Sequence, residues 1–205
     1  MEKLRMAFPK GNQAVTDLLH QAGFLLPPNF EESRLYLIPL ANTSLELILA
    51  KPADIPVYVE YGAADVGIVG KDILLEKQRD VYELLDLQIS VGCLSILSIA
   101  KPARSPLRVA TMYPRLAAEH YRQTGKQVDV IKLSGEPELA LLTGLADCVL
   151  GVLDKSPSSS MAMGWDYIRR VSDRLIANRA SYHIKHKDIQ HLHAALQLPM
   201  KCART

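Results

Sequence analysis

The sequence has no marked excess of charge of either sign. It contains 24 lysine and arginine residues against 22 aspartate and glutamate residues, a net charge of +2. A chain so close to neutral has no overall field that would draw it to nucleic acid or to an anionic membrane surface. The sequence also lacks a long apolar run, since its longest uncharged stretch, 87–100, is too short and too rich in serine to span a bilayer. We therefore expect neither nucleic acid nor a membrane among its partners.

Cysteine is scarce as well, and the spacing of the three cysteines suggests neither a disulfide framework nor a metal site. Cys93 and Cys148 lie in apolar runs, which predicts buried thiols in a reducing compartment. The first residues, MEKLRMAFPKG, show neither the apolar segment nor the small-residue cleavage site of an export signal. A hydrophobic content of 48% and a charged content of 22% are typical of a globular protein. Together these features predict a cytoplasmic α/β protein.

Glycine is missing from the loop that most resembles a phosphate site. An apolar run, 149–153, is followed by a loop rich in hydroxyl groups, 154–160, and helix-compatible sequence resumes near Met161. A strand that opens into exposed N–H and O–H groups before a helix is how α/β proteins bind phosphate. Here no glycine lets the backbone close around an anion, and Pro157 removes one donor. The pattern predicts a phosphate loop of unusual composition, formed by Asp154, Lys155, Ser156, Ser158 and Ser159.

Short apolar runs and amphipathic stretches alternate along the chain, which predicts an α/β fold. Asp54 and Ser181 are expected to cap helices, the second of which runs to about Gln197. The expected strands are 3–8, 35–38, 45–50, 66–69, 94–100, 107–110, 128–132 and 174–177. The expected helices follow the turn at 9–11, Asp54, Gly70, Pro114, Pro137 and Ser181.

One segment is echoed within the chain. Residues 54–70 resemble residues 136–152, because each is an apolar-faced helix followed by Gly-x-Ala-Asp and a buried strand. The echo predicts two similar lobes, 1–89 with 176–205 and 90–175, and a cleft where the carboxyl ends of their strands face each other. The alternative is convergence of two segments on a common helix–strand turn.

Several polar residues follow the predicted strands, where α/β folds bind ligands. Lys10, with Gly11 and Asn12, begins the first helix, and Lys51 precedes the next capped helix. Lysines at such positions attract anions, although each is equally explained as a solvated surface residue. Arg34 has the guanidinium that suits bidentate contact with phosphate, and Glu138 lies in a similar turn of the second lobe. The histidines at 183, 186 and 193 are interpreted as one polar face of the last helix rather than a metal site.

Four longer segments resemble the short form of ATP phosphoribosyltransferase, the first enzyme of histidine biosynthesis. They are YVEYGAADVGIVGKDILLE (58–76), VYELLDL (81–87), VDVIKLSGEPELALLTGLAD (128–147) and SDRLIANRAS (172–181), with PKG at 9–11. The resemblance implies a two-lobed fold like that of type II periplasmic binding proteins and a homodimeric core. It also implies a glycosyltransferase that joins ATP to phosphoribosyl pyrophosphate with Mg²⁺, partnered by a regulatory subunit like histidyl-tRNA synthetase.

The resemblance also assigns roles to residues. Lys10, Arg34 and Lys51 would face ATP and the leaving pyrophosphate, with Gly11 and Asn12 in the same substrate-binding turn. Glu138 and the 154–160 loop would hold the phosphoribosyl group. The chain departs from the family pattern at Asn12, where the family has arginine, and in the loop, where the family has Thr-Gly-x-Thr. Two functions therefore stand: catalysis with Lys155 and the serines as the phosphate cradle, or nucleotide binding by a regulatory or scaffolding subunit.

Overall fold

The computed structural model describes residues 3–32, 35–99, 106–135, 138–153 and 163–202. The chain forms two compact units, one of residues 1–90 with 172–205 and one of residues 91–171. The return to the first unit comes earlier than the sequence suggested, at 172 rather than 176. The reason is that strand β11 (Asp173–Ala177) pairs with strands of the first unit along its whole length. The cleft expected between the lobes remains a prediction.

The first unit is built on a six-stranded sheet with the order β2-β3-β1-β4-β11-β5. Its central strand β1 is parallel to both β3 and β4, whereas β2 and β11 run antiparallel to their neighbours. The central strands are apolar on both faces, as expected where helices cover a sheet on two sides. The strands are β1 (Leu4–Pro9), β2 (Leu37–Pro39), β3 (Leu45–Ala50), β4 (Val66–Gly70) and β5 (Tyr82–Asp86).

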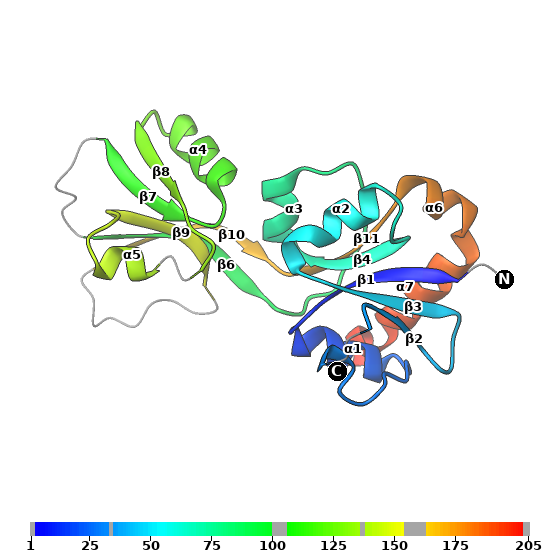
Figure 1. Ribbon diagram of the computed structural model, residues 1–205. Helices are drawn as coiled ribbons and strands as arrows, with labels where there is room; N and C mark the ends of the chain where they lie inside the picture. Colours follow the sequence, from blue (N-terminus) through cyan, green and yellow to red (C-terminus); the bar gives the residue numbers. More distant parts are fainter. Residues whose placement is uncertain (1–2, 33–34, 100–105, 136–137, 154–162, 203–205) are drawn as a thin grey trace. The chain divides into compact units, whose positions relative to one another are not determined.

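Helices cover both faces of this sheet (Figure 1). Helices α1 (Gln13–Gln21) and α7 (His186–Cys202) pack on one face, over a core that includes Met6, Phe8 and Leu175. Helices α2 (Ile55–Glu60) and α3 (Lys71–Lys77) pack on the other face. Two short 3₁₀ turns, η1 (Phe30–Glu32) and η2 (Pro52–Asp54), complete the unit. Asp54 precedes α2 as expected, but its side chain makes no capping hydrogen bond.

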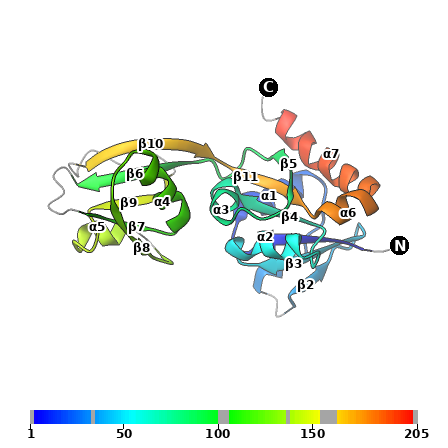
Figure 2. The same cartoon turned by 90° about the horizontal axis from the view of Figure 1, so that it is seen from above.

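The carboxyl-terminal region contains two helices instead of one (Figure 2). Helix α6 (Arg179–Ile184) is followed by its C-cap residue, Lys185, and α7 begins at His186. Asn178, and not Ser181, caps α6, since its Oδ1 accepts a hydrogen bond from the Ser181 N–H at 2.9 Å. The Ser181 hydroxyl is used elsewhere, donating to Asp65 at 2.7 Å. The break also separates His183 from the histidines of α7, so they do not share one helix face.

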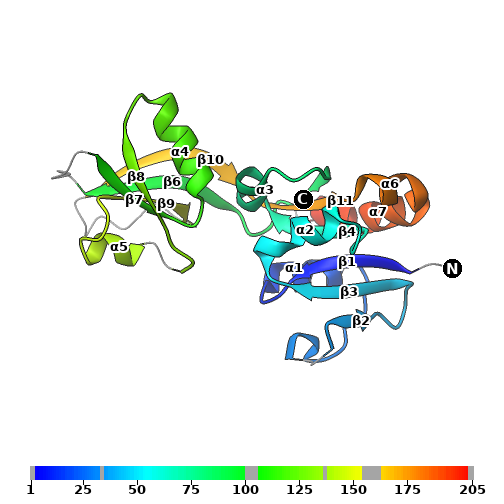
Figure 3. The same cartoon turned by 45° about the horizontal axis from the view of Figure 1, so that its top comes forward.

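The second unit is built on a five-stranded sheet with the order β10-β6-β9-β7-β8. Helix α4 (Pro114–Gln123) packs on one face and α5 (Glu138–Leu142) on the other (Figure 3). Strands β7, β8 and β9 are parallel to one another. Strand β6 is antiparallel to β9, and β10 is antiparallel to β6. The strands are β6 (Gly92–Ile99), β7 (Leu107–Thr111), β8 (Val128–Lys132), β9 (Cys148–Leu153) and β10 (Met163–Val171).

Strand β10 replaces the helix expected after Met161. It pairs with β6 from Met163 to Val171, with a register shift after Tyr167. Trp165, Tyr167 and Val171 are residues that favour strands, and pairing with β6 decides the conformation. Its partner β6 had been expected as a strand from the apolar run alone.

The two units contain the same hydrogen-bonding arrangement at the two places where the sequence echo occurs. In the first unit, Asp65 accepts the Arg5 backbone N–H at 2.8 Å and returns its own N–H to the Arg5 carbonyl at 2.9 Å. In the second unit, Asp147 accepts the Arg108 N–H at 3.0 Å and returns its own at 2.9 Å. A glycine with positive φ ends the preceding helix in both cases, at +72° for Gly62 and +67° for Gly144. The shared geometry argues for true repetition over convergence on a turn.

Candidate functional site

The clearest site candidate in the first unit is the carboxyl edge of β1 and β3. These strands are parallel neighbours whose last residues, Pro9 and Ala50, are in register. Lys10 and Lys51 are the next residues along each strand, and the Lys10 N–H donates to the Ala50 carbonyl at 3.0 Å. Both lysines are exposed, and within the described residues neither side chain makes a hydrogen bond or an ion pair. The structure thus brings the two predicted cations side by side with their charges uncompensated.

A tight turn links β1 to α1 at this edge. Gly11 has a φ of +82°, which favours glycine, and the Asn12 N–H donates to the Pro9 carbonyl at 3.3 Å. The Gly11 N–H donates to the Glu31 carboxylate at 2.6 Å. Glu31 was not among the residues predicted from the sequence, because nothing in its local pattern shows that it returns to residue 11.

Asn12 is turned into the protein and not left open for a ligand. Its Oδ1 accepts the Val15 N–H at 3.3 Å and caps α1, while its Nδ2 donates to Asp173 at 2.9 Å and to Ser90 at 3.3 Å. Asp173 is only 5% exposed, and burial raises the pKa of its carboxyl group, an effect that hydrogen bonds from Ser90 and Asn12 oppose. A contact of Asn12 with substrate remains a prediction. In the structure, its side chain joins α1 to residues 90 and 173.

The carboxyl end of β4 adds charged groups that are already paired. Lys71 forms an ion pair with Glu83, and Arg174 forms one with Asp86 at 2.7 Å. The Ser172 hydroxyl donates to the same Asp86 carboxylate at 2.8 Å. Because these cations have carboxylate partners, Lys10 and Lys51 remain the stronger candidates for an incoming anion.

The corresponding edge of the second unit lies at the ends of β7 and β8. Thr111 is buried there: its hydroxyl donates to the Leu150 carbonyl at 2.8 Å and accepts the Tyr113 N–H at 2.9 Å. Ser134 and Gly135 follow β8 and are exposed, and Glu138 is the first residue of α5. The other predicted site residues fall outside the described part of the chain: Arg34, Asp154, Lys155, Ser156, Ser158 and Ser159.

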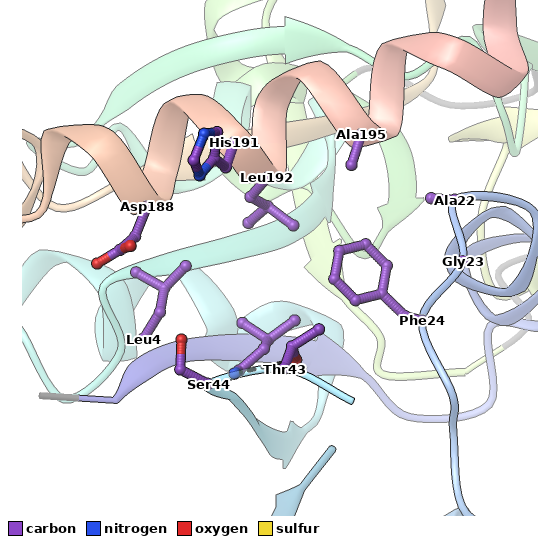
Figure 4. Close-up of a pocket in the computed structure, with 11 residues that line it drawn as sticks. Leu4, Ala22, Gly23, Phe24, Thr43, Ser44, Asp188, His191, Leu192 and Ala195 are labelled. Carbon is purple, nitrogen blue, oxygen red and sulfur yellow. Dashed lines mark hydrogen bonds between the residues drawn. The ribbon is translucent and has the colours of Figure 1, made fainter. Parts of the chain in front are cut away.

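A cavity of about 340 Å³ lies at the opposite edge of the first unit's sheet (Figure 4). Leu4 and Leu45, the first residues of β1 and β3, line it together with Phe24. Asp188 and His191 face it from α7. Since it is at the amino ends of the strands, it is separate from the edge that carries Lys10 and Lys51.

The described residues contain neither a metal-binding cluster nor a membrane-spanning helix. No group of three or more histidine, cysteine, aspartate or glutamate side chains there is arranged to hold a metal ion. No helix in those ranges is long and apolar enough to cross a membrane. Of the cysteines, Cys148 is buried beside Tyr121, and burial raises the pKa of its thiol, whereas Cys93 is only partly buried.

Solved structures with the same fold identify the class. The ancestral amino acid-binding protein AncCDT-1 aligns with a TM-score of 0.56 at 10% identity, covering 98% of this chain and 90% of its own. The ATP phosphoribosyl transferase (HisG:HisZ) complex from Thermotoga maritima aligns with a TM-score of 0.81 at 23% identity, covering 95% and 96%. The chain thus has the two-lobed α/β fold of periplasmic-binding-protein-like domains.

Sequence comparison identifies the family within that class. The family model described as HisG, ATP phosphoribosyltransferase, matches residues 51–198. The ATP phosphoribosyltransferase of Geobacillus kaustophilus is 43% identical over 195 residues, 92% of this chain and 94% of the relative. That of Shouchella clausii is 41% identical over 192 residues, 91% and 90% of the two chains. The chain belongs to the ATP phosphoribosyltransferase family.

Proposed function

We propose that this protein is an ATP phosphoribosyltransferase, a glycosyltransferase that joins ATP to phosphoribosyl pyrophosphate. The products are phosphoribosyl-ATP and pyrophosphate, and the reaction is the first step of histidine biosynthesis. The observation that carries the proposal is an identity of 41–43% with enzymes of this name over about nine-tenths of both chains.

The chemistry calls for positioning and charge neutralisation more than for acid–base groups. Adenine N1 attacks the anomeric carbon as the pyrophosphate group leaves with the bonding electron pair. Both substrates are polyanions, so fixed cations lower the cost of bringing them together and stabilise the charge that develops on the leaving group. Lys10 and Lys51 are suited to this role because they are adjacent and exposed, and no carboxylate of the described residues pairs with either of them.

The remaining predicted residues complete the proposal. Arg34 follows η1, whose Glu31 contacts the Gly11 turn, and we assign it to the same anion. Glu138 and the loop residues Asp154, Lys155, Ser156, Ser158 and Ser159 are assigned to phosphoribosyl pyrophosphate. Asn12 is assigned to the turn that carries the site, since its side-chain amide is bonded to Val15, Ser90 and Asp173.

Magnesium and protein partners are further parts of the proposal. Because the described residues form no cluster of three metal-binding side chains, we assign Mg²⁺ to the substrates' phosphate groups, whose charge it would neutralise. The Thermotoga maritima enzyme is a HisG:HisZ complex. By analogy, we propose a homodimer of this chain that joins a histidyl-tRNA-synthetase-like regulatory subunit in the cytoplasm.

The test is formation of phosphoribosyl-ATP by the purified chain, alone and with the regulatory subunit, in ATP, phosphoribosyl pyrophosphate and Mg²⁺. The Lys10→Ala and Lys51→Ala variants should each lose about tenfold to a hundredfold in kcat/KM, as expected for removal of one electrostatic contact to the reacting phosphates. Lys187→Ala, which removes an exposed lysine of α7, is the matched control and should keep full activity. Absence of product in both preparations would instead support a nucleotide-binding or scaffolding role.

A further inference from the structure

The backbone N–H of Gly11 already binds an oxyanion that belongs to the protein. The Glu31 carboxylate accepts this N–H at 2.6 Å, across 20 residues of sequence. The contact is exposed, although an exposed carboxylate would ordinarily be left to water. Within the described residues Glu31 has no ion pair that would account for its position.

The fold holds Glu31 in this place through its neighbours. Phe30 is buried and packs edge-on against Phe8 of β1, with 5.4 Å between the ring centroids. The Glu32 N–H donates to the Asn29 carbonyl at 3.0 Å and closes the turn. The packing of Phe30 against Phe8 therefore positions the Glu31 side chain beside residue 11. The Glu32 side chain, in contrast, is exposed.

The chemistry of this position matches a phosphate oxygen as well as a carboxylate. A backbone N–H in a glycine turn, followed by the first turn of α1 and flanked by Lys10, provides a directed donor and a positive local potential. One N–H cannot fully serve two anions at once. A phosphate group drawn by Lys10 and Lys51 would meet a donor that is occupied and a carboxylate that repels it.

We propose that Glu31 is an internal competitor for the phosphate group of the substrate, and that substrate binds at the Gly11 turn by displacing it. The proposal rests on the assignment of this edge to ATP and pyrophosphate made above. It makes Glu31 a specificity residue: ligands with several phosphate charges displace the carboxylate, and ligands with a single weak anionic group do not. Glu31 sets substrate affinity without contacting the reacting atoms.

The test compares the whole chain with two variants, Glu31→Gln and the matched control Glu32→Gln. Glutamine at 31 keeps an acceptor for the Gly11 N–H but removes the charge, so the turn keeps its structure and the competition weakens. Replacing a charge-assisted hydrogen bond with a neutral one should lower the Kd for ATP and for inorganic pyrophosphate about fivefold to tenfold, measured by calorimetry. Glu32→Gln should leave both dissociation constants unchanged.

Kinetics give a readout that a purely structural role would not produce. Glu31→Gln should lower KM for ATP with kcat unchanged, since the displaced group is absent from the chemical step. Equal or weaker ligand binding by Glu31→Gln, with wild-type thermal unfolding, would overturn the competition and leave the site assignment intact. Failure of all three proteins to bind ATP or pyrophosphate would overturn the site assignment and this inference with it.

Discussion

The aspartate of the Gly-x-Ala-Asp echo occurs once in each unit, so the contribution of its buried contact to stability can be compared between the two units. Asp65 and Asp147 occupy equivalent places and are 6% and 4% exposed. Both accept a backbone N–H from a strand of their own unit, Asp65 from β1 and Asp147 from β7. Asp65 also accepts the Ser181 hydroxyl at 2.7 Å and the Lys185 ammonium at 2.9 Å, and no side chain of the described ranges makes such a contact with Asp147. The same substitution should therefore have different costs in the two units.

The magnitudes follow from the groups left without partners. Asp147→Ala leaves one backbone N–H without its side-chain acceptor, which should cost about 1–3 kcal/mol. Asp65→Ala also removes the carboxylate partner of Lys185, whose side chain is only 15% exposed. Breaking such a buried ion pair costs about 3–5 kcal/mol. Adding Lys185→Met to Asp65→Ala removes the positive charge that has lost its carboxylate and should recover about 1–2 kcal/mol of that loss.

Urea unfolding gives the free energies, with two probes because the units need not unfold together. Trp165, the only tryptophan, lies in β10 and reports on the second unit, while far-ultraviolet circular dichroism reports on both. Asp129→Ala, an exposed aspartate of β8, is the control and should change stability by less than about 0.5 kcal/mol. A loss at Asp147 as large as that at Asp65 would refute the reasoning, because it would mean that Ser181 and Lys185 add nothing.

Three further predictions rest on single contacts. Gly67→Ala should cost about 1–3 kcal/mol by thermal unfolding, because its Cβ would lie 2.8 Å from the Ile55 side chain, whereas Gly135→Ala, with open space around it, should be near neutral. Asp173→Asn should stabilise the protein at pH 7 and less so as the pH falls toward 4. In the folded protein, burial raises the pKa of the Asp173 carboxyl group above its ordinary value of 3.8. Ionised Asp173 therefore lowers the free energy of unfolding at a pH above the folded-state pKa, and this loss disappears below pH 3.8. A thiol reagent followed by peptide mass spectrometry should modify Cys148 far more slowly than Cys93 until the protein unfolds, since burial raises the pKa of the Cys148 thiol; equal rates at these two cysteines would contradict this.

Local sequence predicted the elements whose own residues decide them. Strands β3 and β8 were predicted to the residue: β3 is a largely apolar run that is buried, and β8 is a short, half-buried strand rich in β-branched residues. The Gly-x-Ala-Asp echo predicted two similar lobes, and in both units the glycine has a positive φ and the aspartate accepts a backbone N–H. Lys10 and Lys51 were each predicted to follow a strand, and the parallel pairing of β1 with β3 is what places them at the same edge.

Elements that depend on a distant partner were predicted wrongly or missed. Strand β5 went unpredicted because it is an edge strand, half-buried, and stabilised by β11. The segment after Met161 was expected to be helical, and β10 forms because β6 lies beside it. The break between α6 and α7 also escaped prediction, as Asn178 and Lys185 bond to groups more than 100 residues away.

The sequence by itself determined the family, the alternating α/β pattern and the strand ends at which charges gather. These follow from local periodicity, turn chemistry and long segments that resemble the family, all of which lie in consecutive residues. Only the tertiary structure decided which of those charges are free. It paired Lys71 and Arg174 with carboxylates, turned Asn12 inward to Asp173 and brought Glu31 to the Gly11 N–H. Such contacts join residues 12 to 161 positions apart, and a linear pattern carries no record of them because packing brings their partners together.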